Sequence, residues 1–198
     1  MPPLTEQAHA IIRQVVRPGD VAIDATAGNG HDSRFLAELV GESGFVFAID
    51  IQQQALQKTA ALLGDAVLAH LHLAQRDHAE LKATIPSEYY GHIAVVMFNL
   101  GYLPGGDRTL ATRTDSTLVA LRSALEILKP GGVLTVIAYP GHAGGANEAL
   151  AVERLLRELS LAGYAMARHS AASESDSAPC LFVVTKHASP EEPSMRGA

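Results

Sequence analysis

The alternation of apolar runs with amphipathic segments limits this chain to few folds. Short apolar runs, which we interpret as strands, lie at residues 21–24, 45–50, 66–73, 93–98 and 133–139. Segments with helical spacing of apolar residues lie near 31–40, 52–63, 77–84, 114–128 and 145–161, and a further one precedes them at 5–16. This alternation is typical of a parallel sheet with crossover helices. We therefore predict an α/β fold with a doubly wound, mostly parallel sheet.

The C-terminal part of the chain departs from this alternation. Two strand-like segments, about 164–169 and 180–186, have no crossover helix between them, which predicts an antiparallel hairpin at one sheet edge. The hairpin completes a seven-stranded, Rossmann-like sheet. With 47% hydrophobic residues, the chain can bury the core of one domain, which we place at 1–187. Residues 188–198 are polar and proline-rich and predict a flexible C-terminal tail.

Charge and cysteine content indicate which partners and which cellular compartment to expect for this protein. The net charge of −6 lacks the basic excess of most nucleic-acid-binding proteins, so we expect no DNA partner and only local RNA contacts. Cys180 is the only cysteine, and the N-terminal residues do not form a signal-peptide pattern. No segment approaches the roughly 20 apolar residues of a membrane span. These features predict a soluble, cytoplasmic protein without membrane contact.

A glycine turn follows the first predicted strand. Gly28-Asn29-Gly30 lies where ligands bind in open α/β sheets, just before the helix that begins near His31. Glycines allow close backbone approach, and a helix N-terminus offers free N–H groups to an anion. The third glycine of the dinucleotide fingerprint is replaced by Ser33. The turn therefore indicates a cofactor site, although a simple tight turn has the same pattern.

Acidic residues at neighbouring strand ends distinguish between cofactors. Asp50 ends the second predicted strand, where a carboxylate can accept both ribose hydroxyl hydrogens of NAD or S-adenosylmethionine. Asp24 would repel a pyrophosphate but attract the cationic ammonium and sulfonium of S-adenosylmethionine, which we therefore predict as the cofactor. Asp24 would hold the ammonium directly or through a water; capping of the turn is the alternative. Asp77, after the third strand, is predicted equally as a contact to the adenine amino group or as a helix N-cap.

The sequence NLGYLPGGD, Asn99 to Asp107, follows the fourth predicted strand. Reacting groups gather at the carboxyl end of a central strand. The loop resembles that of amino-group methyltransferases, in which an amide oxygen and the next backbone carbonyl accept the N–H hydrogens of the target amine. A glycine-rich turn with Asn99 as a turn residue is the alternative.

Several histidines and arginines have less certain roles. His142 follows the fifth predicted strand and could accept a proton, orient the substrate or cap the next helix. His70 and His72 share one face of a predicted strand, but they lack a clustered third ligand, so we predict no metal site. Three arginines near the loop could contact phosphates or form a solvated face: Arg108, Arg113 and Arg122.

Four motifs together resemble the YtqB/MnmM-like family of S-adenosylmethionine-dependent methyltransferases. They are Asp24–Asp32, Asp50–Gln52, Asn99–Asp107 and Tyr139–His142, within a similarity that extends from about His9 to Lys186. The resemblance implies a class I methyltransferase fold. Members are described as rRNA methylases, and the better-supported role is methylation of the 5-aminomethyl group of 2-thiouridine at the tRNA wobble position. The expected partner is therefore tRNA at its anticodon region, and homodimer formation is left open.

These patterns and the resemblance together define a set of site residues. The predicted cofactor-binding residues are Asp24, Thr26, Gly28, Asn29, Gly30, His31, Asp32, Asp50, Gln52, Asp77 and Asn99. The predicted catalytic residues are Asn99, Tyr102 and His142. Three alternatives are a methyltransferase of the same fold acting on rRNA or a small amine, a non-catalytic S-adenosylmethionine-binding protein, and an NAD-dependent oxidoreductase. The Asn99 loop argues against the second and Asp24 against the third.

Overall fold

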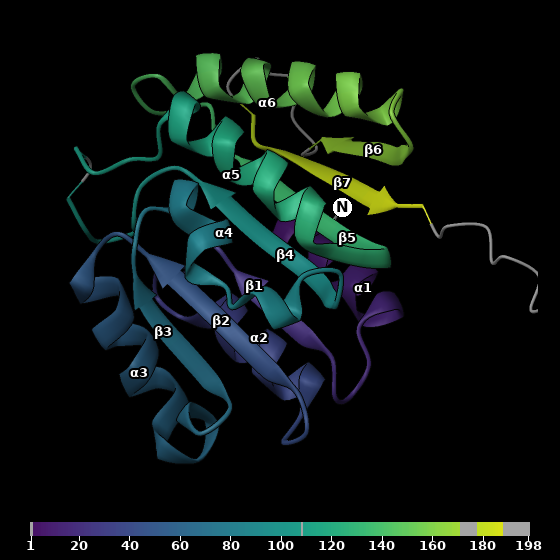
Figure 1. Cartoon of the computed structure of the whole chain (residues 1–198). Helices are drawn as coiled ribbons and strands as arrows, with labels where there is room; N and C mark the ends of the chain where they lie inside the picture. Colours follow the sequence, from purple (N-terminus) through teal and green to yellow (C-terminus); the bar gives the residue numbers. More distant parts are fainter. Residues whose placement is uncertain (1, 108, 171–177, 188–198) are drawn as a thin grey trace, which may run out of the picture.

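The protein is built around one mixed sheet of seven strands in the order β3-β2-β1-β4-β5-β7-β6 (Figure 1). The computed structural model describes residues 2–107, 109–170 and 178–187. The parallel strands are β1 (Val21–Asp24), β2 (Phe45–Asp50), β3 (Leu71–Gln75), β4 (Ile93–Leu100) and β5 (Leu128–Ala138). β7 (Cys180–Lys186) is antiparallel to β5 and to β6 (Tyr164–Ser170). The predicted fold class is confirmed, including its antiparallel edge pair.

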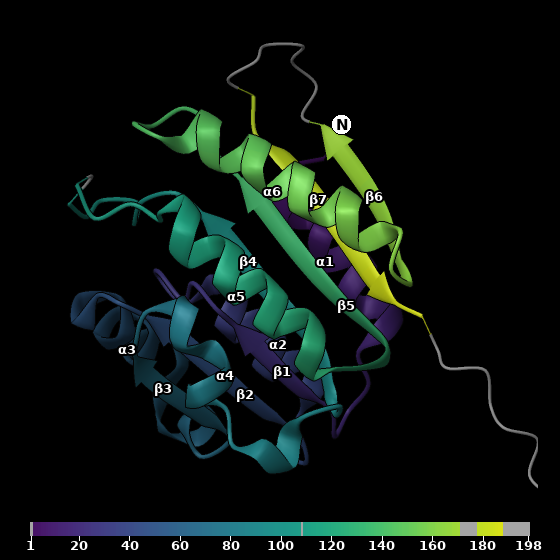
Figure 2. The ribbon, with the colours of Figure 1, turned by 45° about the horizontal axis from the view of Figure 1, so that its top comes forward.

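Helices cover both faces of the sheet (Figures 1 and 2). One face carries α1 (Leu4–Val15), α2 (His31–Val40) and α3 (Gln53–Leu68). The other carries α4 (Leu81–Thr84), α5 (Thr114–Ile127) and α6 (Gly145–Ser160), with the short 3₁₀ turns η1 (His78–Glu80) and η2 (Ser87–Tyr89) on the connections. Because both faces are covered, β4 is buried along nearly its whole length, which explains its continuous apolar run.

The predicted third strand, 66–73, is misplaced. Helix α3 turns at Gly64, whose φ is +71°, and continues to Leu68, so the strand begins only at Leu71. Val67 and Leu68 pack on the core from this helical extension, and His70 lies in the turn before the strand. A short apolar run looks the same in a buried strand and in a buried helical turn. The segment 77–84 is likewise divided, into η1 and α4.

Two predicted strands are longer than expected. β4 continues to Leu100, so Asn99 is fixed by strand pairing rather than by a loop. β5 begins at Leu128, and residues 129–132 form a bulge because Ile93 pairs with Leu128 but Val95 pairs with Val133.

The carboxyl ends of the parallel strands lie at one edge of the sheet, and the strand order reverses between β1 and β4. Such a switch point is where open α/β sheets bind ligands.

The predicted tail at 188–198 lies outside the described residues. The predicted single domain at 1–187 stays a prediction. Within the described part of the chain, no helix is long and apolar enough to cross a membrane.

Candidate active site

A cavity of about 1030 Å³ opens at the carboxyl ends of the parallel strands. Its volume lies near the upper end of the roughly 300–1,000 Å³ typical of ligand pockets. Most of the predicted site residues line it: Thr26, Gly28, Asn29, His31, Asp32, Asp50, Gln52, Asp77, Asn99, Tyr102 and His142. Asp24 and Gly30 are not on its wall.

The glycine turn is fixed by two close approaches. Gly30 has a φ of +85°, and a Cβ there would lie 2.8 Å from the Cα of Thr59 on α3. Gly28 donates its N–H to Asp50 Oδ2 at 2.9 Å. Gly30 thus allows α2 to pack closely on α3, whereas Gly28 forms part of the cavity wall.

Asp50 combines a structural role with the predicted ribose contact. Its Oδ1 accepts the Gln52 N–H at 2.8 Å and its Oδ2 accepts the Gly28 N–H at 2.9 Å, and the Ile51 N–H is a further backbone partner of the carboxylate. Burial raises the pKa of this carboxyl above its usual value. Because each carboxylate oxygen can accept more than one hydrogen bond, Asp50 can also accept from a pair of vicinal hydroxyls.

Asp24 lies beneath the cavity wall and not on it. Its side chain is fully buried, Oδ1 accepts the Thr26 N–H at 3.2 Å, and Oδ2 accepts the Ser33 hydroxyl at 2.6 Å. These contacts match the capping alternative, and the predicted contact of Asp24 with the cofactor ammonium through a water stays a prediction. The acidic group on the cavity wall is Asp32. Burial, reinforced by the charge of Asp32, raises the pKa of Asp24 to about 7.

The raised pKa of Asp24 predicts that the protein loses stability as pH rises. The folded-state pKa of about 7 exceeds the ordinary value of 3.8, so the folded state binds more protons between these values. The free energy of unfolding should therefore fall by on the order of 2–4 kcal/mol from about pH 4 to about pH 7 through this group. Asp24→Asn should lack this fall, because an amide does not ionise. The variant should still fold, since the amide can accept the Thr26 N–H and donate to Ser33.

Urea unfolding of both proteins at about pH 5 and about pH 8 measures the difference. The exposed Asp65 provides a control, and Asp65→Asn should keep the wild-type pH dependence. Equal pH dependence in wild type and Asp24→Asn would contradict the assignment.

Asp77 satisfies one of its two predicted roles. Its carboxylate accepts the Ala79 N–H at 2.9 Å and caps η1, so the N-cap role is present. The same residue lines the cavity, and its contact with adenine stays a prediction.

Asn99 is held in one orientation by two neighbouring elements. Its N–H donates to Thr26 Oγ1 at 2.7 Å, and its side-chain Nδ2 donates to Asp32 Oδ2 at 2.6 Å. Because a carboxylate only accepts hydrogen bonds, the amide nitrogen must face Asp32, which leaves Oδ1 to accept from a ligand. The next carbonyl, that of Leu100, accepts the Tyr139 N–H at 3.2 Å and belongs to a fully buried residue, and its role as second acceptor stays a prediction.

His142 lies on the cavity wall but does not offer a ring nitrogen to it. Nδ1 is 3.1 Å from the Ala143 carbonyl oxygen. Nε2 is buried without a hydrogen-bond partner among the described residues, and it packs so closely on Gly145 that a Cβ there would lie 2.7 Å away. The ring is edge-on to Tyr102, with centroids 6.2 Å apart. In this arrangement His142 shapes the wall, and its role as proton acceptor stays a prediction.

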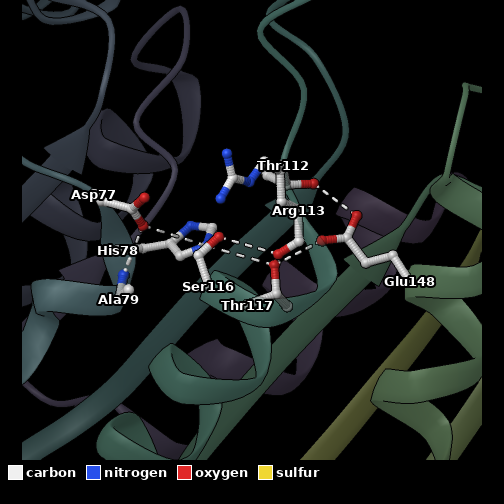
Figure 3. Close-up of polar contacts among 8 residues, drawn as sticks. All are labelled: Asp77, His78, Ala79, Thr112, Arg113, Ser116, Thr117 and Glu148. Carbon is white, nitrogen blue, oxygen red and sulfur yellow. Dashed lines mark hydrogen bonds and ion pairs between the residues drawn. The ribbon is translucent and has the colours of Figure 1, made fainter.

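A buried glutamate that the sequence did not predict fixes the loop after β4 (Figure 3). Glu148, in the first turn of α6, accepts the hydroxyls of Thr112 at 2.7 Å and Thr117 at 2.6 Å. Thr112 also donates its N–H to the Gly101 carbonyl, and Thr117 lies 3.4 Å from His78 Nε2. Burial lowers the pKa of His78. Glu148 therefore links α5, α6 and residues 101–113, although a glutamate in an amphipathic helix is usually interpreted as a surface residue.

Removing this glutamate should loosen the cavity wall. Glu148→Ala removes the carboxylate that accepts from the buried Thr117 hydroxyl and the half-buried Thr112 hydroxyl, and we expect a loss of about 1–3 kcal/mol in the free energy of unfolding. Glu148→Gln should lose less, because an amide can bond to both hydroxyls after they rotate. Chemical denaturation measures the order of the two variants, with Glu158→Ala near the end of α6 as control. A Glu148→Ala protein as stable as wild type would contradict the linking role.

Helix α1 contributes further residues that the sequence did not predict. Thr5 lines the cavity and hydrogen-bonds to Tyr139, another wall residue. One turn later, His9 Nε2 lies 2.6 Å from Asp32 Oδ1. The spacing of four residues on a predicted helix places Thr5 and His9 on one face, which is the only sign in the sequence that they lie together.

The three arginines that the sequence places near the loop lie apart. Arg113 lines the cavity, the exposed Arg122 does not, and Arg108 lies outside the described residues.

The charges around the cavity fit S-adenosylmethionine. Asp32 and Asp50 line it and Asp24 lies beneath the turn, so the potential favours a cationic sulfonium and disfavours a pyrophosphate. The first N–H groups of α2, which have no partner within the helix, can bind a carboxylate. In the described ranges, no group of three or more His, Cys, Asp or Glu side chains could hold a metal ion.

Comparison with known families agrees with this fit. The model of the family described as "Putative rRNA methylase" matches residues 46–185, which include Asp50, Asn99 and His142. The chain belongs to this family. The methyltransferase family that the four motifs predict for this chain is thereby confirmed.

Curated and structurally solved proteins resemble the chain over most of its length. A chloroplastic tRNA (mnm(5)s(2)U34)-methyltransferase of Arabidopsis thaliana is 40% identical over 158 residues, which are 75% of this chain and 57% of that protein. The chain thus spans little more than half of that relative. A Clostridium thermocellum structure with the family's description is 35% identical, with a TM-score of 0.87 over 94% of this chain and 98% of its own.

A Streptococcus mutans structure, described as a "putative methyltransferase" in complex with SAH, is 30% identical, with a TM-score of 0.82. The match covers 94% of this chain and 99% of that one.

Proposed function

We propose that this protein transfers the methyl group of S-adenosylmethionine to the 5-aminomethyl nitrogen of 2-thiouridine at the wobble position of tRNA. Family membership and the SAH-bound Streptococcus mutans structure support cofactor and reaction class. The Arabidopsis relative, whose description names this nucleoside, supports the substrate. The observation that carries the proposal is the Asn99 amide, held by Asp32 at the end of β4 with its oxygen left for an amine hydrogen.

The chain's own residues mainly bind and position the reactants. S-adenosylmethionine, when bound, supplies a methyl carbon made electrophilic by its sulfonium. Asp50 would accept the ribose hydroxyls, and the glycine turn would allow close approach of the cofactor backbone. Asn99 Oδ1 would accept one N–H of the neutral amine, which aims the nitrogen lone pair along the line from methyl carbon to sulfur. The nitrogen–carbon bond forms as the carbon–sulfur bond breaks, and the nitrogen then releases one proton.

Ribosomal RNA is a second candidate substrate, because the family description names it. A small-molecule amine is a third, and the net charge of −6 favours it over a large RNA surface. Arg113 and Arg76 line the cavity and would be the nearest cations to an RNA phosphate. A non-catalytic S-adenosylmethionine sensor would need no amine-orienting amide. The cytoplasmic location and a homodimer stay predictions.

The test is transfer of tritiated methyl groups into three acceptors. These are tRNA from cells that lack this methyltransferase, rRNA from the same cells, and a small-molecule extract. We expect label in the tRNA, at one nucleoside that digestion and mass spectrometry identify as the methylated aminomethyl-thiouridine. Transfer RNA without the aminomethyl group is the control and should take no label. Label confined to rRNA or to the extract would contradict the proposed substrate.

A further inference from the structure

Three side chains from three elements form one hydrogen-bonded chain that ends at the cavity. His9 on α1 contacts Asp32 on α2 at 2.6 Å, and Asp32 accepts from Asn99 on β4 at 2.6 Å. Side-chain exposure is 19% for His9 and 9% for Asp32, so water competes little for either bond. His9 therefore connects the N-terminal helix to the amide that faces the substrate.

The position of His9 excludes a direct contact with the reactants. Asp32 and Asn99 line the cavity, but His9 does not. Its ring is stacked on Phe35, with centroids 3.7 Å apart and an interplanar angle of 7°, which fixes the direction in which Nε2 points. The hydrogen bond to Asp32 therefore connects His9 to the cavity wall.

Each carboxylate oxygen of Asp32 has a separate side-chain partner. Oδ1 is bound by His9 and Oδ2 by Asn99, so the two bonds fix the carboxylate plane. Without His9, a nearly buried carboxylate oxygen would lose its donor, at a cost comparable to an unsatisfied charged group. Asp32 would then turn to recover a donor, and Asn99 would lose the anchor that directs its oxygen to the cavity.

We propose that His9 is a positioning residue for methyl transfer, which acts by holding Asp32 so that the Asn99 amide oxygen faces the incoming amine. The kinetic test of the His9 role depends on the methyl transfer to tRNA that we propose as the function. The hydrogen-bonded chain itself can be measured without a substrate. His9 forms and breaks no covalent bond in this role.

Two substitutions separate the hydrogen bond from the packing of the ring. His9→Phe keeps an aromatic ring on Phe35 but removes the donor to Asp32. His9→Gln removes the ring, and its amide nitrogen can occupy nearly the place of Nε2. His92→Phe, at an exposed histidine before β4 and outside the cavity wall, is the matched control.

With aminomethyl-thiouridine tRNA, we expect His9→Phe to lower kcat by roughly 10- to 100-fold, because loss of positioning degrades the in-line geometry. The Kd for S-adenosylmethionine and the KM for tRNA should stay within about 3-fold, since His9 touches neither. His9→Gln should recover most of the rate, and His92→Phe should equal wild type. Wild-type kcat in His9→Phe, or equal losses in His9→Phe and His9→Gln, would overturn the proposal.

A second readout keeps the inference testable if the wild-type protein does not methylate this tRNA, in which case the proposed function itself fails. The side-chain NH₂ signals of Asn99, assigned by their loss in Asn99→Ala, report the bond to Asp32. We expect their protection from hydrogen exchange to be lost in His9→Phe and kept in His9→Gln. Unchanged protection in His9→Phe would overturn the positioning role independently of any substrate.

Discussion

Asn99→Ala is expected to slow methyl transfer by on the order of 100-fold while the affinity for S-adenosylmethionine stays within a few-fold. The amide oxygen is the group that would orient the amine, and a misplacement of about 1 Å can cost this much in rate. Asn99 is fixed through its own N–H and Nδ2, so the alanine variant loses the amide without losing the strand position, which depends on backbone pairing with β5.

Single-turnover rates with saturating cofactor and aminomethyl-thiouridine tRNA measure this effect. Calorimetry provides the cofactor affinity of the same protein. Asn147→Ala, at an exposed position on α6, is the matched control and should react at the wild-type rate. A higher pH should not rescue Asn99→Ala, because the defect lies in orientation and not in protonation of the amine. A wild-type single-turnover rate in Asn99→Ala would mean that the amide does not orient the substrate.

Asp50→Ala should weaken S-adenosylmethionine binding by about 1.5–3 kcal/mol, which is the usual cost of losing hydrogen bonds to a charged group. The loss has two sources. The ribose hydroxyls would lose their acceptor, and the Gly28 and Gln52 N–H groups would no longer hold the turn in its binding conformation.

Isothermal calorimetry with wild type, Asp50→Ala and Asp50→Asn measures the effect. Asp50→Asn should lie between the other two, because an amide keeps one acceptor oxygen. Asp65→Ala, an exposed position on α3, should bind like wild type. NADH should not bind, because its pyrophosphate would meet the negative potential of Asp32 and Asp50 on the cavity wall. Undiminished S-adenosylmethionine affinity in Asp50→Ala, or micromolar affinity for NADH, would contradict this assignment of the cavity.

The acidic groups around the glycine turn have different tasks although they look alike in the sequence. Asp24 is buried and ties the turn to α2, Asp50 fixes the turn and faces the cavity, and Asp32 orients Asn99. Their closeness favours a positively charged ligand, because the charges of Asp32 and Asp50 both raise the pKa of the buried Asp24. A sulfonium cofactor would relieve this repulsion.

The amino-acid sequence determined the features that depend on local pattern. The alternation of apolar runs with amphipathic segments predicted the doubly wound sheet, because a strand buried on both faces needs a continuous apolar run. Gly28, Asn29, Asp50 and Asn99 could be placed at the cavity because parallel strands end at the same edge. The third strand was misplaced because the apolar residues before Leu71 have no local feature that distinguishes a helical turn from a strand.

Tertiary structure decided the features that depend on residues distant in the chain. Asp24 and Glu148 are buried only because other elements cover them, and their carboxylates bind groups of the protein from those elements. His9 reaches Asp32 only because α1 docks beside β5 and β7 and brings its inward face to α2. No spacing rule connects His9, Asp32 and Asn99, since their contact follows from the packing of three elements and not from the period of any one of them.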